Sequence, residues 1–264
     1  MTDWLSVTPG EAPVIVSVPH AGTIIPDAIS GLVSHDLARR DADHHVDRLY
    51  AFAADLGATI LRSRVSRTVI DLNRDPSGQS LYPGQATTGL CPDTTFDGEL
   101  LYQAGAEPDA AEIDQRRAMW FDPYHAALRE QIARLRVLHP AIVLYDAHSI
   151  RSRVPRLFDG ELPQFNIGSY DGASCDSALT AAIAARCAGD THVVNGRFKG
   201  GWITRRYGKP ARGIHAVQIE LAIRGYADED GAWPPLWDAV RAGPMQDKLR
   251  AILTSCLDFA KDQS

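Results

Sequence analysis

Two histidines stand where chemistry is expected in an α/β protein. His20 closely follows the apolar, β-branched run 13–18, and His148 follows the run 141–145 together with Asp146. Short apolar runs of this kind predict strands that are buried on both faces. The carboxyl ends of such strands form the ligand-binding edge of an open α/β sheet. One strand-end histidine often only caps a loop, but two in the same setting are hard to explain by packing, so we interpret both as functional.

Glu220 is a carboxylate within the run 214–222, which alternates and then becomes continuously apolar. Burying a carboxylate costs free energy unless the group is paired or used in chemistry. Two histidines and one carboxylate would form an open catalytic zinc site with a fourth position for water. Zinc lowers the pKa of its bound water to roughly 7, and a nearby glutamate can pass the proton to the leaving nitrogen. Glu220 is therefore the predicted general base.

The segment 40–50 contains acidic residues beside two histidines and leads into a predicted alanine-rich helix that ends at Gly57. Asp41 or Asp43 suits the N-cap of this helix, because a carboxylate accepts hydrogen bonds from the free amides of the first turn. Asp43 and Asp47 are four residues apart and would share one helical face. Capping explains Asp43 about as well as metal ligation does. Asp47 lies one turn further in, so a ligand role suits it better.

Asn73 and Arg74 follow the predicted strand 68–70. A guanidinium matches a carboxylate bidentately and a neighbouring amide adds a neutral donor, so this pair could bind a substrate carboxylate. The structural alternative is a salt bridge from the arginine to Asp71 or Asp75.

Two loops are predicted near the site. The glycine-rich segment 195–208 contains three arginines, a lysine and a tyrosine, which predicts a mobile loop that binds anions. It lacks the G-x-x-x-x-G-K-[ST] spacing of a phosphate loop. The segment 77–108 is rich in Gly, Pro, Thr and Asp and has little periodicity. Loops this long in compact domains tend to cover functional sites.

The elements that must position these residues predict one α/β domain over residues 1–264. The chain is long enough for a large buried core, and no low-complexity linker divides it. Further strands are predicted at 58–61, 164–168 and 191–194. Helices are predicted at 109–138 with a break at Asp122-Pro123, at 177–187 and at 236–260.

The composition limits the partners and the location. The formal net charge is −6 and basic residues are scattered, so we expect a small-molecule site and no nucleic-acid partner. No apolar run approaches the ~20 residues of a membrane span and no N-terminal segment resembles a signal peptide. We therefore expect a soluble, cytoplasmic protein with no membrane partner. The four cysteines lie far apart without C-x-x-C spacing, and we expect them to be reduced and structural.

Six ordered segments together resemble the N-formylglutamate amidohydrolase family, also called N-formylglutamate deformylases. They lie within about residues 13–222 and are Val18-Pro-His-Ala-Gly22, Asp43-His-His-Val-Asp-Arg-Leu-Tyr50, Ile70-Asp-Leu-Asn-Arg-Asp75, Tyr145-Asp-Ala-His-Ser149, Gly200-Gly-Trp-Ile-Thr204 and Gln218-Ile-Glu-Leu221. That family is related to the zinc carboxypeptidases and to aspartoacylase. The resemblance implies a zinc cofactor. It also implies a single three-layer α/β domain of the zinc-carboxypeptidase type, with a mostly parallel or mixed central sheet and helices on both faces.

The resemblance implies that His20 and His148 are zinc ligands. The ligand pair of the wider superfamily is H-x-x-E, yet the third residue after His20 is Thr23, which cannot replace a glutamate. The missing carboxylate must come from elsewhere in the chain. We predict that Asp47 supplies it, with Asp43 or His45 as alternatives.

The resemblance also implies the substrate, N-formyl-L-glutamate, which is hydrolysed to formate and L-glutamate in histidine degradation. Glu220 would be the general base, and Arg67 would lie against the substrate carbonyl. A dianionic substrate needs two carboxylate sites. Asn73 and Arg74 would form one site, and the loop that contains Arg205 and Arg206 the other, with Arg205 as our candidate.

Two alternatives remain open. The chain could be a metallo-amidohydrolase that acts on another N-acyl amino acid or a small peptide, because the motifs specify the chemistry better than the acyl group. It could also be a non-catalytic anion-binding protein of the same fold. Such a protein would have no reason to retain a buried Glu220 beside both histidines.

Overall fold

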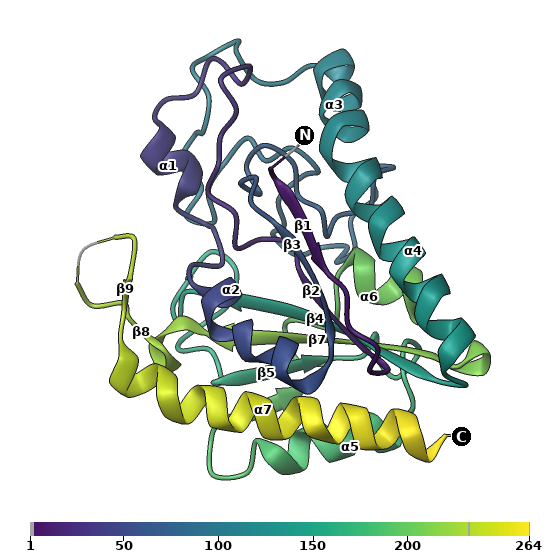
Figure 1. Ribbon diagram of the computed structural model, residues 1–264. Coiled ribbons are helices and arrows are strands. Elements are labelled where there is room, and N and C mark those ends of the chain that lie inside the picture. The colour runs from purple at the N-terminus through teal and green to yellow at the C-terminus, as the bar shows by residue number, and fades with distance from the viewer. Residues whose placement is uncertain (1–2, 232, 264) are drawn as a thin grey trace.

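A seven-stranded sheet forms the centre of the computed structural model, which describes residues 3–231 and 233–263 (Figure 1). The strands of this sheet are β1 Leu5–Thr8, β2 Val14–Val18, β3 Thr59–Ser63, β4 Ile142–Ile150, β5 Phe165–Gly168, β6 His192–Val194 and β7 Ile214–Ala222. Their spatial order is β1-β3-β2-β4-β7-β5-β6. The neighbours β3, β2, β4 and β7 are parallel, whereas β1 and β5 run antiparallel to β3 and β7. The predicted mixed, mostly parallel sheet is therefore confirmed.

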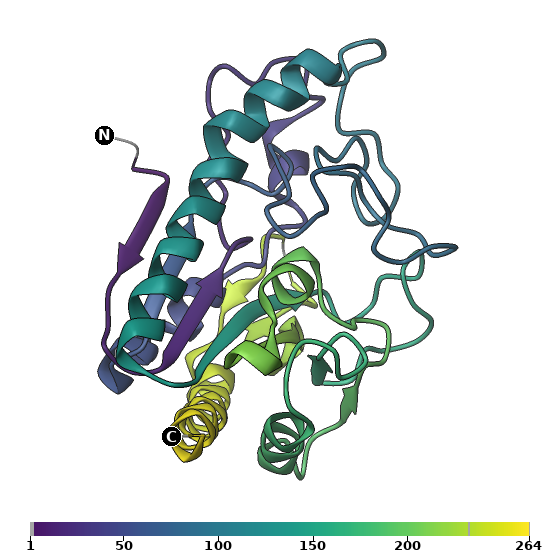
Figure 2. The same cartoon turned by 90° about the vertical axis from the view of Figure 1, so that its right-hand side faces the viewer.

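Helices cover both faces of the sheet, as predicted. They are α1 His35–Arg39, α2 Val46–Leu49, the 3-10 helix η1 Ala51–Leu56, α3 Ala110–Arg116, the π-helix η2 Arg117–Phe121, α4 Asp122–Leu138, α5 Ser177–Arg186, α6 Trp202–Tyr207, the 3-10 helices η3 Pro210–Arg212 and η4 Ile223–Gly225, and α7 Ala239–Asp262. A small hairpin of β8 Ala227–Asp228 and β9 Leu236–Trp237 precedes α7. One core contains buried residues of α2, η1, α5 and α7, and a second contains those of α4 and α6. Figure 2 shows α7 and α5 lying together, away from the long helix of α3 and α4.

The period of two along the strands decides which side chains enter each core. In β4, Val143, Tyr145 and Ala147 pack in the core that contains α5 and α7. Their neighbours Asp146 and His148 therefore lie on the other face, which is the face covered by α4 and α6. That face therefore carries an apolar core around Ile142 and Leu144 and, further along the same strand, the polar side chains of Asp146 and His148.

Two predicted elements are wrong in detail. The run Thr68-Val-Ile70 forms a turn and not a strand, because Ser66 accepts hydrogen bonds from Thr68 N through its side chain and from Val69 N through its carbonyl. Local hydrogen bonds of this kind compete with a sheet ladder even where the residues are β-branched. The predicted loop 195–208 also contains the short helix α6.

The break predicted at Asp122-Pro123 is a π-helical turn within one long helix. Pro123 has no amide proton to donate, and its ring excludes the carbonyl four residues earlier, so a widened turn before it relieves the clash. Among the described residues, no helix combines the length and apolar character needed to cross a membrane. All four cysteines are free, and three of them are buried.

The contribution of α7 to stability can be tested with a matched pair of substitutions. Leu249 is completely buried in the core beneath this helix, whereas Val240 on the same helix is 84% exposed. Leu249→Ala should lower the free energy of unfolding by about 2–5 kcal/mol, because it removes buried methyl groups and leaves a cavity. Val240→Ala should change it by less than about 0.5 kcal/mol. Urea unfolding followed by circular dichroism measures both, and equal effects would contradict the assigned packing.

Candidate active site

Two neighbouring strands place two polar rows side by side. Asp146 and His148 of β4 are paired in register with Gln218 and Glu220 of β7. All four side chains are buried, and they lie on the sheet face that is covered by α4 and α6. A period of two within each strand brings each residue and its second neighbour to the same face. The pairing of the two strands therefore places two carboxylates, one amide and one imidazole next to one another on one face of the sheet.

His20 and Asp43 lie beside these four side chains and come from two loops. His20 follows β2, whose Ser17 is paired in register with Asp146. The backbone amide of Asp43 donates to the carbonyl of His20 at 3.0 Å, and the amide of Ser149 donates to Asp43 Oδ2 at 3.1 Å. These two backbone hydrogen bonds hold the Asp43 carboxylate beside both histidines.

His20, Asp43 and His148 form a cluster whose potential ligand atoms all lie within 4.8 Å of one another. Asp43 Oδ2 lies 3.1 Å from His148 Nδ1 and 3.9 Å from His20 Nδ1. The opposite ring nitrogens donate to carboxylates, His20 Nε2 to Asp71 at 2.8 Å and His148 Nε2 to Asp146 at 2.9 Å. Metal-binding histidines almost always have such a partner on their other nitrogen.

The buried Nδ1 of His20 has no hydrogen-bond partner among the described residues. A buried nitrogen without a hydrogen-bond partner costs free energy. Because His20 Nδ1 faces Asp43 and His148, a ligand bound between these residues would remove this cost. Two imidazoles and one carboxylate suit a divalent transition metal and match the donor set of open catalytic zinc sites. The residues present therefore fit a metal cofactor.

The electrostatics of the cluster also suit a cation. Burial, together with the cation of Arg67, lowers the pKa of His20, so its imidazole is neutral and able to bind a metal. Burial opposes a charge on His148, but the carboxylates of Asp146 and Asp43 outweigh it and raise the pKa of His148 well above its usual value. The carboxylates around His148 thus favour a positive charge at this position, which a bound metal ion would supply.

Arg67 connects the cluster to the surrounding carboxylates. Its guanidinium is buried and donates to Asp43 Oδ1 at 3.3 Å and to Asp71 Oδ2 at 2.7 Å. It also lies over the ring of Phe96 at 4.8 Å. Arg67 therefore orients both carboxylates while it lines the same pocket as the histidines.

Asp47, the ligand predicted from sequence, lies outside this cluster. Its carboxylate accepts a hydrogen bond from Arg62 at 2.7 Å and is partly exposed. The alternative His45 lies 2.8 Å from the carbonyl of Pro235 through its Nε2. Asp47 lies outside the cluster because the helix begins at Val46 and not at Asp43, with His45 in the left-handed conformation at its N-cap. Asp43, the other alternative, lies in the preceding turn and enters the cluster.

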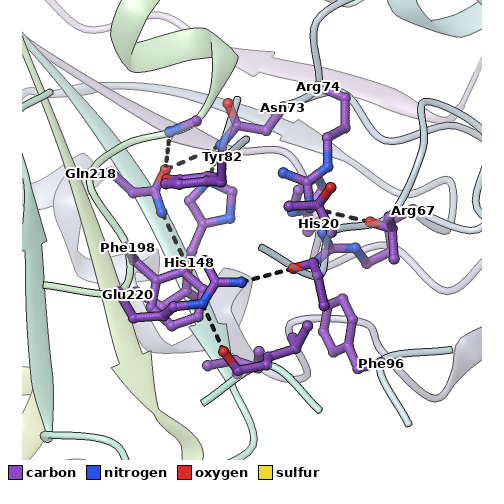
Figure 3. Close-up of a pocket in the computed structure, with 17 residues that line it drawn as sticks. His20, Arg67, Asn73, Arg74, Tyr82, Phe96, His148, Phe198, Gln218 and Glu220 are labelled. Atoms are coloured by element: carbon purple, nitrogen blue, oxygen red, sulfur yellow. Dashed lines mark hydrogen bonds between the residues drawn. The ribbon is translucent and has the colours of Figure 1, made fainter. Parts of the chain in front are cut away.

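The cluster opens into a pocket with a volume of about 60 Å³. Pockets for drug-sized ligands measure roughly 300–1,000 Å³, so this one suits a small molecule. Figure 3 shows Gln218 and Glu220 on one side of it and Arg67 and Arg74 on the other. Arg74 Nη2 donates to Thr88 Oγ1 at 3.1 Å.

Asn73 also lines the pocket, but its amide is committed to the protein. Its Oδ1 accepts from Ile203 N at 2.7 Å, and its Nδ2 donates to Asp146 Oδ2 at 2.9 Å. Asn73 thus orients Asp146, the carboxylate that supports His148. The sequence predicts that Asn73 and Arg74 together bind a substrate carboxylate. In the structure the Arg74 guanidinium lines the pocket, whereas the Asn73 amide bonds to Ile203 and Asp146.

Glu220 lines the pocket, and no cation of the described residues forms an ion pair with it. Burial, assisted by the nearby charge of Asp43 and opposed by His148, raises the pKa of Glu220 to about 8. Gln218 Nε2 donates to Glu220 Oε2 at 3.2 Å, and Gln218 Oε1 accepts from Gly201 N at 2.7 Å. The position and high pKa of Glu220 suit a group that exchanges a proton.

Arg205, the second predicted carboxylate ligand, does not line this pocket. Its guanidinium donates to the carbonyls of Gly200 and Leu81 and lies between the rings of Tyr82 and Tyr170 at 4.8 and 4.6 Å. Arg197 from the same segment lines the pocket in its place.

A model of the N-formylglutamate amidohydrolase family matches residues 12–227. The chain belongs to this family. Proteins named N-formylglutamate deformylase from Pseudomonas aeruginosa and Pseudomonas putida are 46% and 45% identical to it over 267 aligned residues, covering 100% of this chain and 99% of each relative. The crystal structure of N-formylglutamate amidohydrolase from Ralstonia eutropha JMP134 is 22% identical, covers 100% of both chains and has a TM-score of 0.84. The sequence relatives show that the chain is a hydrolase, and the structural neighbour confirms the fold.

Four residues of the site were not identified from the sequence as functional. Asp146 and Gln218 lie two residues before His148 and Glu220 on buried strands, so strand alternation could have placed them on the same face. Asp71 was considered only as a salt-bridge partner, and no pattern linked it to His20. Arg197 could not be distinguished from the other arginines of its glycine-rich segment.

The choice between the two aspartates can be tested with Asp43→Asn and Asp47→Asn. Asp43→Asn should weaken zinc binding by at least about 100-fold, because it removes the only carboxylate of the cluster. Asp47→Asn should bind zinc normally, since it breaks only a partly exposed ion pair that contributes about 0–1 kcal/mol. Competition with a chromogenic chelator measures the affinity. Normal zinc binding by Asp43→Asn would rule out the cluster as the metal site.

Proposed function

We propose that this chain hydrolyses N-formyl-L-glutamate to formate and L-glutamate with a zinc ion held by His20, Asp43 and His148. The observation that carries the proposal is the placement of this cluster and Glu220 in one small pocket with arginine side chains. The names of the relatives support the substrate. The role in histidine degradation and the cytoplasmic location stay predictions from the sequence.

A bound zinc ion would act as a Lewis acid on the formyl oxygen and would lower the pKa of a coordinated water to roughly 7. The protein prepares its ligands before any metal binds. Asp71 and Asp146 fix the tautomers of the two histidines through their Nε2 atoms, so that both Nδ1 atoms point toward Asp43. Such outer partners orient the ligands and increase their basicity.

Glu220 is the proposed general base. Its carboxylate takes a proton from the attacking water and delivers it to the amide nitrogen as the C–N bond breaks. Gln218 fixes one oxygen of the carboxylate, which leaves the other free to accept the proton. A carboxylate with a pKa near 8 binds this proton more readily than an exposed one, and a nearby metal cation would keep the group ionised before the reaction.

Arg67 and Arg74 are the proposed electrostatic partners of the substrate. The Arg67 guanidinium is held by two carboxylates beside His20, where it can stabilise the negative charge that develops on the formyl oxygen. The Arg74 guanidinium, fixed by Thr88 and by Asp71 at 3.5 Å, is placed to bind a substrate carboxylate. Asn73 supports the site through Asp146 and is proposed as a positioning residue.

The role of Glu220 predicts a selective loss of turnover. Glu220→Gln should lower the rate of formate release by about 100-fold or more while zinc binding is unchanged, because the amide cannot accept the proton. Glu130→Gln, which changes an exposed residue of α4, is the matched control and should keep normal activity. Formate is measured with a coupled dehydrogenase assay and zinc by elemental analysis. Normal turnover by Glu220→Gln would refute the assignment.

The cofactor can be tested by removing and restoring the metal. The purified protein should release formate from N-formyl-L-glutamate, lose this activity after treatment with a chelator and regain it when zinc is added. A zinc-binding protein that releases no formate would retain the hydrolase site but require a different N-acyl amino acid. A protein with neither formate release nor metal binding would contradict the proposed function.

A further inference from the structure

Arg197 lies in the segment between β6 and α6, and it lines the same pocket as Arg74 and Glu220. Its Nε donates to the carbonyl of Leu157 at 2.8 Å, and its Nη2 donates to the carbonyl of Ala86 at 2.8 Å. Two carbonyls from two different loops therefore fix the plane of the guanidinium. The conformational entropy of this long side chain is therefore already lost before any ligand binds.

The same guanidinium lies over two aromatic rings. The Arg197 Cζ atom lies 5.4 Å from the ring centroids of both Tyr82 and Phe198. Tyr82 is itself anchored, because its hydroxyl donates to the carbonyl of Gly200 and accepts from Lys199 N. The rings stabilise a cation without neutralising its charge.

Arg197 differs from the other two arginines of the pocket in its lack of a counter-ion. Arg67 pairs with Asp43 and Asp71, and Arg74 lies 3.5 Å from Asp71. No carboxylate of the described residues forms an ion pair with Arg197, and its Nη1 donates to no described protein atom. Burial lowers the pKa of Arg197 and the nearby charge of Arg74 acts in the same direction, while Tyr82 and the more distant carboxylate of Glu220 oppose them in part. A buried cation that has no carboxylate in direct contact is stabilised when an anion binds.

We infer that Arg197 binds the side-chain carboxylate of the substrate and thereby selects a dicarboxylate such as N-formyl-L-glutamate over a neutral analogue. This inference rests on the proposed function for its substrate. The apolar side chains of Ile150, Leu157 and Phe198 share the pocket with Arg197, and they offer a surface for the two methylenes of a glutamate side chain. Arg74 then remains for the α-carboxylate.

The test compares an acidic substrate with its neutral isostere. Wild-type protein, Arg197→Gln and Arg206→Gln are assayed as zinc-loaded enzymes with N-formyl-L-glutamate and N-formyl-L-glutamine. In Arg197→Gln the ratio of kcat/KM for the acid to that for the amide should fall roughly 10- to 100-fold, mainly through KM. Arg206 is exposed on α6 and lies outside the pocket, so Arg206→Gln should keep the wild-type ratio.

The ratio separates recognition from folding, because a general structural defect lowers both substrates together. An unchanged ratio in Arg197→Gln would overturn the inference. Arg197→Lys serves as a second variant if the glutamine variant does not fold. It keeps a positive charge but lacks the planar fork, so its ratio should fall less than that of Arg197→Gln.

A binding measurement distinguishes a failure of this inference from a failure of the proposed function. Calorimetry with glutarate and butyrate compares a dicarboxylate with a monocarboxylate and requires no turnover. Wild-type protein should prefer glutarate, and Arg197→Gln should lose most of that preference. If wild type releases no formate from either substrate, the proposed function fails, whereas the glutarate preference still decides the role of Arg197. Equal glutarate preference in both proteins would overturn it.

Discussion

The buried carboxylate of Asp71 joins the parts of this site that perform different tasks. Its Oδ1 accepts hydrogen bonds from His20 Nε2 and from Asn73 N, and its Oδ2 accepts from Arg67 Nη2. Arg74 Nε lies 3.5 Å from the same Oδ2. One aspartate thus fixes a histidine of the candidate metal cluster and two arginines of the same pocket. Burial would raise its pKa, but His20, Arg67 and Arg74 outweigh this effect and hold the pKa well below its usual value.

This network replaces regular secondary structure on one side of the site. Residues 64–109, all of which the structure describes, contain isolated β-bridges but no helix or strand. Figure 2 shows this segment between β3 and α3 as extended loops. Loops without a sheet ladder depend on side-chain and turn hydrogen bonds to satisfy their backbone. The polar network that orients the chemistry is therefore also a large part of what holds these loops in place.

The sequence predicts best those parts of the site that depend on strand periodicity. The sequence indicates His148 because it follows a buried apolar run, and Glu220 because a carboxylate within such a run is energetically unusual; the sheet pairs the two in register. The sequence pattern favours Asp47 over Asp43 only if the helix begins near Asp43; because it begins at Val46, Asp43 lies in the preceding turn and does not share a helical face with Asp47. Backbone contacts such as that between Asp43 N and His20 O are long-range and leave no local pattern.

The arginines of the segment 195–208 show that loop residues are harder to place from sequence than strand residues. Arg197 and Arg205 have similar surroundings in the sequence, and both donate to backbone carbonyls in the structure. Arg205 lies over the rings of Tyr82 and Tyr170 and does not line the pocket, whereas Arg197 also lies over Tyr82 but lines the pocket. The pocket residues on β4 and β7 are fixed by the sheet, whereas the pocket arginines lie on loops, where the direction of a side chain depends on packing. A change of one loop side chain such as Arg197 can therefore alter the pocket while His148 and Glu220 stay paired in register.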